Sequence, residues 1–260
     1  MRTIVLCCLL VSLSPPRSAS AERSGPSFRQ RRAERAYGIA KNASYIPWHF
    51  HDWCEARALA LSAELTLAGI PSSMVYLQKP GRYKPLTPPG KDGVRWKNHV
   101  GVLVDGKMID PGLCRRPETL KTWMRRAGQP EGVKPWLRIK PGSHSFDGAR
   151  LAWTGRRVCC EATTDLAKLP KFHGGHMIKS YMNLVWSWAM TGNSTPRIEQ
   201  LCRRMSSVMN QLTDRGQLDP KASPGRYPPQ PGTWPTRWWP AKIELDPATN
   251  RYISVTRRTR

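Results

Sequence analysis

Residues 96–112, WKNHVGVLVDGKMIDPG, predict a β-hairpin around which the rest of the fold can be built. Asp105-Gly106 stands between two apolar runs, and this dipeptide is the strongest short-range signal for a two-residue hairpin turn. Such a turn pairs Val104 with Lys107. The same register continues outward and pairs Leu103 with Met108, Val102 with Ile109, Gly101 with Asp110 and His99 with Gly112.

This register places His99 and Asp110 on one face of the hairpin as diagonal neighbours. Their Cβ atoms should lie roughly 7 Å apart or less, which lets an imidazole and a carboxylate form a hydrogen bond. A slip of one residue would separate the pair, so the prediction depends on the turn. The opposite face is apolar and suits a core: Val100, Val102, Val104 and Ile109.

A helix is predicted directly after His51-Asp52-Trp53-Cys54-Glu55. Asp52 with Glu55 three residues later fits an N-cap and a capping box. Apolar residues follow at helical spacing, and Gly69 ends the helix after Ala58, Leu61, Leu65 and Ala68. Cys54 then occupies the second helical position, where unpaired N–H groups and the helix dipole favour a thiolate. A buried structural cysteine is the alternative for that position.

Taken together, Cys54, His99 and Asp110 supply the groups of a cysteine acyl-transfer site. The thiol would be the nucleophile and His99 the base that takes its proton and returns it to the leaving group. Asp110 would orient the imidazole and stabilise its charged form. We expect His51, Trp53 and Trp96 to contact the substrate.

The order of these motifs resembles the transglutaminase-like core of the papain-type superfamily, and more closely the secreted bacterial protein glutaminases and their deamidase relatives. The resemblance spans about residues 48–125. It is carried by Cys54-x-x-Arg57-Ala58, Trp96-x-x-His99-Val100, Ile109-Asp110-Pro111, Pro117 and Trp123. It implies an α+β fold in which a Cys-bearing helix packs on an antiparallel sheet.

The function that this resemblance implies is protein-glutamine deamidation, in which a Gln side chain becomes Glu and ammonia is released through a thioester. No metal or organic cofactor is required. A transglutaminase or a cysteine peptidase could use the same triad. A basic exported binding module without catalysis is the further alternative.

The first residues predict export. Arg2 precedes the apolar run 4–13, and the small residues 19–21 follow it, as in a secretory signal peptide cleaved after Ala21. We therefore expect a secreted or periplasmic protein. Residues 22–45 are basic and read as an N-terminal arm or as a solvated first helix.

The net charge is +24 over 260 residues, which favours anionic partners. An exported protein would meet an anionic envelope polymer or an acidic protein more readily than nucleic acid. The chain holds no run of about 18 apolar residues, which excludes a membrane-spanning helix.

The rest of the chain divides around a catalytic core at residues 46–127. Residues 128–157 are rich in Pro, Gly and basic residues and read as a linker or long loop. Residues 158–260 read as a mainly helical extension with a Pro- and Trp-rich tail and a final hairpin. Two helices are expected there, one over 176–190 and one that begins at Thr195-Pro196 and ends at Gly216. His173-Gly174-Gly175-His176 reads as a turn and is a weak metal signal.

Export and the expected nucleophile together predict which cysteines are free and which form disulfides. Cleavage would leave five of the seven cysteines, and catalysis requires Cys54 to be free. The remaining four would then form two disulfides. Adjacent cysteines bond to each other poorly, so Cys159 and Cys160 would each pair with one of Cys114 and Cys202.

Overall fold

The hairpin expected at Asp105-Gly106 lies inside a five-stranded antiparallel sheet. Strands β2 (Asn98–Val104) and β3 (Lys107–Ile109) pair in the predicted register, with Val104 opposite Lys107 and Val102 opposite Ile109. Asp105 and Gly106 have φ angles of 48° and 79°. Positive values at both central residues define the type I′ turn, whose twist matches that of the strands.

The strand order of the sheet is β4-β3-β2-β1-β5. Strand β1 (Ser73–Gln78) pairs with β2 on one side and with β5 (Trp136–Pro141) on the other, and β4 (Glu118–Thr119) pairs with β3. The prediction of a linker over 128–157 was therefore wrong for residues 136–141. The sequence did not predict this strand because Pro135 and Pro141 bound a short β segment, and because its pairing partner, β1, lies far away in sequence.

The computed structural model describes residues 27–78, 85–133, 135–142, 171–190 and 195–219, together with the backbone of 241–245 and 252–257. The expected signal peptide, Cys159, Cys160 and the Trp-rich part of the tail lie outside these residues. Within the described part of the chain, no helix has the length and apolar character needed to cross a membrane.

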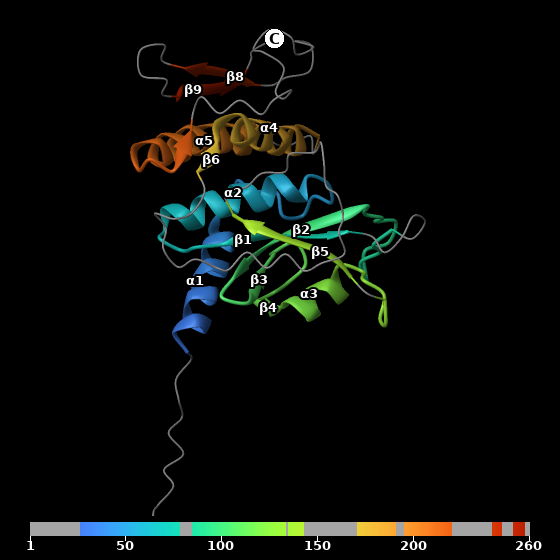
Figure 1. The fold of residues 1–260 in the computed structure, drawn as a ribbon. Helices are drawn as coiled ribbons and strands as arrows, with labels where there is room; N and C mark the ends of the chain where they lie inside the picture. The colour runs from blue at the N-terminus through green and yellow to red at the C-terminus, as the bar shows by residue number, and fades with distance from the viewer. Residues whose placement is uncertain are drawn as a thin grey trace, which may run out of the picture.

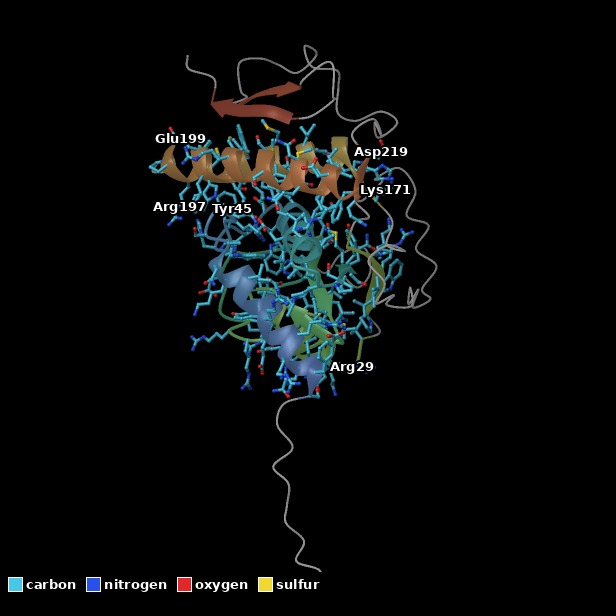
Figure 2. The ribbon with its side chains drawn as sticks, turned by 90° about the vertical axis from the view of Figure 1, so that its left-hand side faces the viewer. Arg29, Tyr45, Lys171, Arg197, Glu199 and Asp219 are labelled. Carbon is cyan, nitrogen blue, oxygen red and sulfur yellow. The ribbon has the colours of Figure 1, made fainter. Side chains whose placement is uncertain are left out.

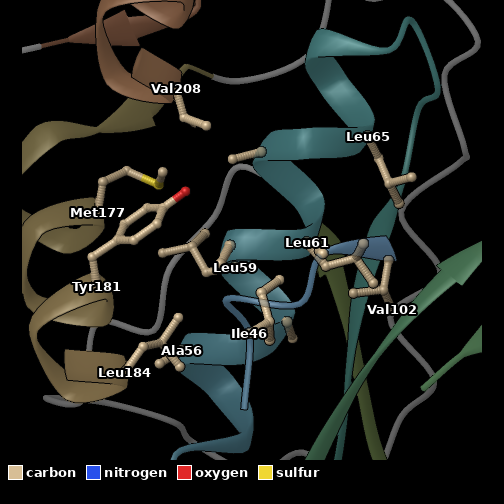
Figure 3. Packing of buried hydrophobic residues seen from close by; sticks show 14 of the residues in the cluster. Ile46, Ala56, Leu59, Leu61, Leu65, Val102, Met177, Tyr181, Leu184 and Val208 are labelled. Carbon is tan, nitrogen blue, oxygen red and sulfur yellow. The ribbon is translucent and has the colours of Figure 1, made fainter. Parts of the chain in front are cut away.

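One face of the sheet is covered by helix α2 (Cys54–Leu67), which is buried on all sides from Ala56 to Thr66. In Figure 3, Leu61 and Leu65 point from α2 toward Val102 of the sheet, and Tyr181 approaches α2 from the opposite side. The sequence predicted a single apolar face for this helix. It is instead enclosed between two layers, because a second pair of helices packs against its outer side.

Those helices are α4 (Gly174–Met190) and α5 (Thr195–Asp214), which form a layer above α2 in Figure 1. Their apolar side chains belong to the same hydrophobic core as α2 and the sheet, and include Met177, Leu184, Met205 and Val208. The two expected helices are thus present. They share the core of the fold and do not form a separate extension.

The C-terminal region also contains two small two-stranded sheets. Strands β6 (Phe172–His173) and β7 (Leu218–Asp219) pair in parallel, and β8 (Ala241–Leu245) pairs with β9 (Tyr252–Arg257) as the expected final hairpin. This hairpin lies above α5 in Figure 1. The predicted turn at Gly174-Gly175 was wrong, because α4 begins at Gly174 and both glycines are helical.

The second face of the sheet packs on helix α3 (Leu120–Arg126) and the loop before β2. A second apolar cluster fills this side and includes Val75, Leu77, Leu86, Met108 and Trp123. Successive residues of β1 alternate between the two clusters, with Met74 and Tyr76 in the first. The sheet is therefore buried on both faces.

Of the two alternatives for residues 22–45, an arm or a solvated first helix, the structure shows a helix, α1 (Phe28–Asn42), one side of which is buried. Ser27 caps it by accepting a hydrogen bond from the Gln30 N–H, and Ala33, Ala36 and Ala40 are buried in the first cluster. Spacings of three and four place these alanines on one side of a helix. Arg29, at the start of α1, lies at the opposite end of the fold from α5 in Figure 2.

Polar groups also join α5 to α2. Arg204 makes two hydrogen bonds to the buried carboxylate of Glu64, and the hydroxyl of Tyr45 donates to the same carboxylate. In Figure 2, Tyr45 lies beneath α5, on the side that faces the rest of the fold. A buried carboxylate is stable only when it is paired and hydrogen-bonded, so this cluster fixes the angle between the helices.

Replacing Leu61 by Ala should lower the free energy of unfolding by about 2–5 kcal/mol, because it opens a cavity between α2 and the sheet. Urea denaturation followed by circular dichroism measures the change. Leu67→Ala on the same helix, where the side chain is only partly buried, is the matched control and should cost less. Equal losses for the two variants would contradict the enclosed position of α2.

Candidate active site

The imidazole of His99 and the carboxylate of Asp110 meet as the hairpin predicted. His99 Nε2 lies 2.8 Å from Asp110 Oδ2, and the two residues are only 2% and 4% exposed. His99 stands near the start of β2, and Asp110 follows the last residue of β3. The type I′ turn therefore brings these two side chains together, because it fixes the register of β2 against β3.

Asp110 accepts two further hydrogen bonds that hold its carboxylate in place. The indole Nε1 of Trp123 donates to Oδ2 at 2.8 Å, and the Gly112 N–H donates to Oδ1 at 3.1 Å. Gly101 leaves room for the indole, since a Cβ there would lie 3.0 Å from a Trp123 ring atom. Trp123 was part of the sequence motif without an assigned role, and its indole orients the carboxylate.

Trp96 stacks on the imidazole of His99, with ring centroids 4.2 Å apart and an interplanar angle of 12°. Its own N–H donates to the backbone carbonyl of His51 at 2.9 Å. The backbone of Trp96 is held by a bridge to Leu86. Trp96 is 7% exposed. It packs against the imidazole of His99 and connects that ring to the segment before α2 through His51.

Cys54 is the first residue of α2, and not the second as expected. The helix has no side-chain cap, and the residue before Cys54, Trp53, has a left-handed backbone with φ 60° and ψ 32°. The predicted capping box at Asp52 and Glu55 was therefore wrong. The chain turns sharply at Trp53, so the Asp52 side chain does not cap the helix.

Burial by itself lowers the pKa of His99, but the charge and hydrogen bond of Asp110 and the neighbouring Cys54 thiol outweigh it and raise the pKa to about 9. Burial raises the pKa of Asp110, but His99, Trp123 and Arg57 outweigh burial and lower that pKa below its ordinary value. Nε2 of His99 is engaged by Asp110, whereas the buried Nδ1 has no hydrogen-bond partner among the described residues. Since Cys54 interacts with the imidazole, Nδ1 is the nitrogen open to the thiol.

The other expected site residues lie beside Cys54 in the chain and at the surface. His51 and Trp53 are exposed, and Trp53 is 41% exposed despite its large apolar ring. The pKa of His51 is lowered by partial burial and by the nearby charges of Lys91 and Arg57. An exposed indole next to Cys54 offers a contact surface to a bound molecule.

Arg57 is a component of the site to which the sequence assigned no role. Its side chain is 4% exposed, and the guanidinium donates to the backbone carbonyl of Asp52. Burial lowers the pKa of Arg57, and the charges of Cys54, Asp110 and Asp52 oppose that effect. Its place in the Cys-x-x-Arg motif could have indicated this position, because a residue three positions after Cys54 lies on the same face of the helix.

The expected disulfide pairing is not found among the described residues. Cys54 is a free thiol as predicted, but Cys114 and Cys202 are also free. They lie apart in the two apolar clusters, at 2% and 3% exposure, where each packs as a small apolar side chain. Residues 159 and 160, their expected partners, lie outside the described part of the chain.

No site for a metal ion is evident in the described ranges, where no group of three or more His, Cys, Asp and Glu side chains comes together. His173 and His176 are in ring contact with centroids 5.6 Å apart, without a third ligand of that kind.

Comparison with solved structures gives three matches. No family model and no curated protein sequence matches the chain. The solved structure of protein-glutaminase from Chryseobacterium proteolyticum is 19% identical, with a TM-score of 0.36, covering 52% of this chain and 93% of that one. Crystal structures of pro-protein-glutaminase and of its A47Q2 mutant are 19% and 21% identical with TM-scores of 0.32 and 0.34. Each covers 47% of this chain, which spans about half of theirs. The chain is thus similar to protein-glutaminase structures.

Iodoacetamide should alkylate Cys54 in the native protein at least roughly tenfold faster than Cys114 or Cys202, since access and thiolate character control the rate. Burial raises the pKa of the Cys114 thiol, and it raises that of Cys202 to about 11. Peptide mapping after timed labelling measures the three rates. Labelling in urea is the control and should make all three similar, whereas slow native labelling of Cys54 would contradict an accessible nucleophile.

The free energy of unfolding should decrease as the pH rises from about 6.5 to 9. The pKa of His99 is raised in the folded state, so its stabilising effect is complete below its ordinary pKa of 6.5 and is lost as the pH passes its folded value of about 9. The expected loss is about 3 kcal/mol. His99→Gln should lack this part of the pH dependence in urea titrations, and a parallel slope in the two proteins would contradict the ion pair.

Proposed function

We propose that this chain is a cysteine-dependent protein-glutamine deamidase, an enzyme that hydrolyses the carboxamide of Gln in protein substrates. The observation that carries the proposal is the buried His99–Asp110 pair beside Cys54 at the start of α2. A nucleophile, a base and a group that orients the base are the set required for acyl transfer.

The first step is attack on the carboxamide. In the reactive state His99 Nδ1 already holds the proton of the Cys54 thiol, and the thiolate sulfur bonds to the carbonyl carbon, whose oxygen becomes an oxyanion. The raised pKa of His99 favours this imidazolium. The Cys54 N–H, at the first position of α2, has no intrahelical partner and can donate to the oxyanion. One such donor is typically worth about 3–4 kcal/mol in the transition state.

The second step releases ammonia and then the product. The tetrahedral intermediate collapses, the C–N bond breaks, and the imidazolium protonates the leaving nitrogen, which leaves a thioester on Cys54. A water molecule that loses its proton to His99 attacks the thioester and yields Glu and the free thiol. Asp110 keeps Nε2 bound throughout, so Nδ1 is the nitrogen that exchanges protons.

The substrate class rests on the resemblance of the motifs and on the surface beside the nucleophile. Trp53 and His51 are exposed next to Cys54, which suits contact with a chain that presents a flexible Gln side chain. If a Lys amine replaced water in the second step, the product would be a crosslink. Attack on a backbone amide would give peptide fragments.

Export and partner choice are part of this proposal. The N-terminal pattern of residues 1–21 supports a secreted or periplasmic enzyme, and the net charge of +24 supports substrates or surfaces that are anionic.

The test is ammonia release from a denatured, Gln-rich protein by the wild type and by Cys54→Ala. We expect release by the wild type and a loss of at least about 10³-fold in the variant, because removing the nucleophile removes the covalent route. Intact-mass analysis of the substrate should show about one dalton added per event without fragments, since NH₂ is replaced by OH.

Cys202→Ala is the matched control, because it removes a free thiol outside the site and should retain activity. Ammonia release that persists in Cys54→Ala would rule out the proposed nucleophile. Substrate fragments would favour a peptidase, and higher-mass crosslinks that require Lys would favour a transglutaminase. Binding without any ammonia would favour the binding module.

A further inference from the structure

We propose that Arg57 is a positioning residue that holds the start of α2 and thereby directs the Cys54 N–H toward the reacting carbonyl. This inference rests on the proposed function of Cys54 and deepens it by naming what organises the oxyanion-binding donor. It begins with Trp53, whose left-handed backbone directly precedes the nucleophile.

The conformation of Trp53 is unfavourable in isolation. A bulky side chain at positive φ crowds the backbone, and such residues persist only where surrounding contacts hold them. The Trp53 side chain does not supply these contacts through burial, because it is 41% exposed. The backbone on either side of Trp53 does make such contacts.

Arg57 binds both peptide groups that flank Trp53. Its guanidinium donates to the carbonyl of Asp52, in the peptide unit before Trp53. Its backbone N–H donates to the carbonyl of Trp53, in the unit after it, at 3.1 Å. The orientations of these two peptide planes define φ and ψ of Trp53. The backbone bond is the first i→i−4 bond of α2 and sets ψ, whereas the guanidinium bond to Asp52 restrains φ and is the one that depends on arginine.

The second of these peptide units contains the Cys54 N–H. Carbonyl and N–H point in opposite directions in a trans peptide, so the bond from Arg57 to the Trp53 carbonyl aims the Cys54 N–H away from the helix. This is the donor proposed for the oxyanion. Fixing the first peptide unit in addition prevents Trp53 from relaxing and rotating that donor.

The position of Arg57 agrees with this role. Its guanidinium is buried, so it does not exchange its partner for water, and it interacts electrostatically with Cys54 and Asp110. Lys would retain the charge but lacks the planar guanidinium with its several donors.

The experiment is a double-mutant comparison that separates backbone strain from loss of the indole. Trp53→Ala and Trp53→Gly both remove the ring, but only Gly adopts positive φ readily. Arg57→Lys is introduced into each. The readouts are the rate of Cys54 alkylation by iodoacetamide and kcat for ammonia release, with KM measured separately.

We expect Arg57→Lys to lower kcat by roughly tenfold or more beside Trp53→Ala and by less than roughly threefold beside Trp53→Gly, since glycine needs no anchor. Alkylation should follow the same pattern, and KM should change equally in both pairs. Equal losses of kcat beside Ala and Gly would overturn the proposal. The Trp53→Ala protein with Arg57 intact should already be slower than Trp53→Gly, and the reverse order would overturn it without any change at Arg57.

Arg204→Lys, on α5, is the matched control at another arginine that binds α2. Arg204 also binds α2 through a bidentate contact, but at Glu64, roughly three turns from Cys54. It should leave the alkylation rate unchanged. If the wild type releases no ammonia, the proposed function fails, while the alkylation rates still decide whether Arg57 positions Cys54.

Discussion

The apolar core and the candidate site both require the observed register of the β2–β3 hairpin. The type I′ turn at Asp105-Gly106 sets it, and side-chain alternation then sends one set of residues to each face of the sheet. His99 and Asp110 meet for this reason, and Val102 faces α2. A slip of one residue would exchange the faces, so packing and the candidate site require the same register.

Helix α2 connects that sheet to the C-terminal half of the chain. It presents Cys54 at its first residue, packs on β2, and carries Glu64 to the bidentate contact with Arg204 of α5. The position of Cys54 relative to His99 therefore depends on the packing of elements far apart in sequence. This explains why α4 and α5 belong to the core even though they contribute none of the three candidate catalytic groups.

The polar groups around Asp110 show how a buried acid is kept charged. His99, Trp123 and the Gly112 N–H all bind its carboxylate, and burial without these partners would raise its pKa. The same contacts leave Nδ1 of His99 as the nitrogen open to Cys54. These hydrogen bonds thus orient the imidazole of His99.

The hairpin register, the free thiol at a helix start and the His99–Asp110 pair could be predicted from the sequence, because turn chemistry and alternation act over a few residues. The left-handed Trp53, the hydrogen bond from Arg57 to Asp52 and the edge strand at residues 136–141 required the folded structure. Each depends on contacts between groups whose local sequence is compatible with other conformations. Packing selects among these conformations because burial on both faces of the sheet leaves room for one arrangement.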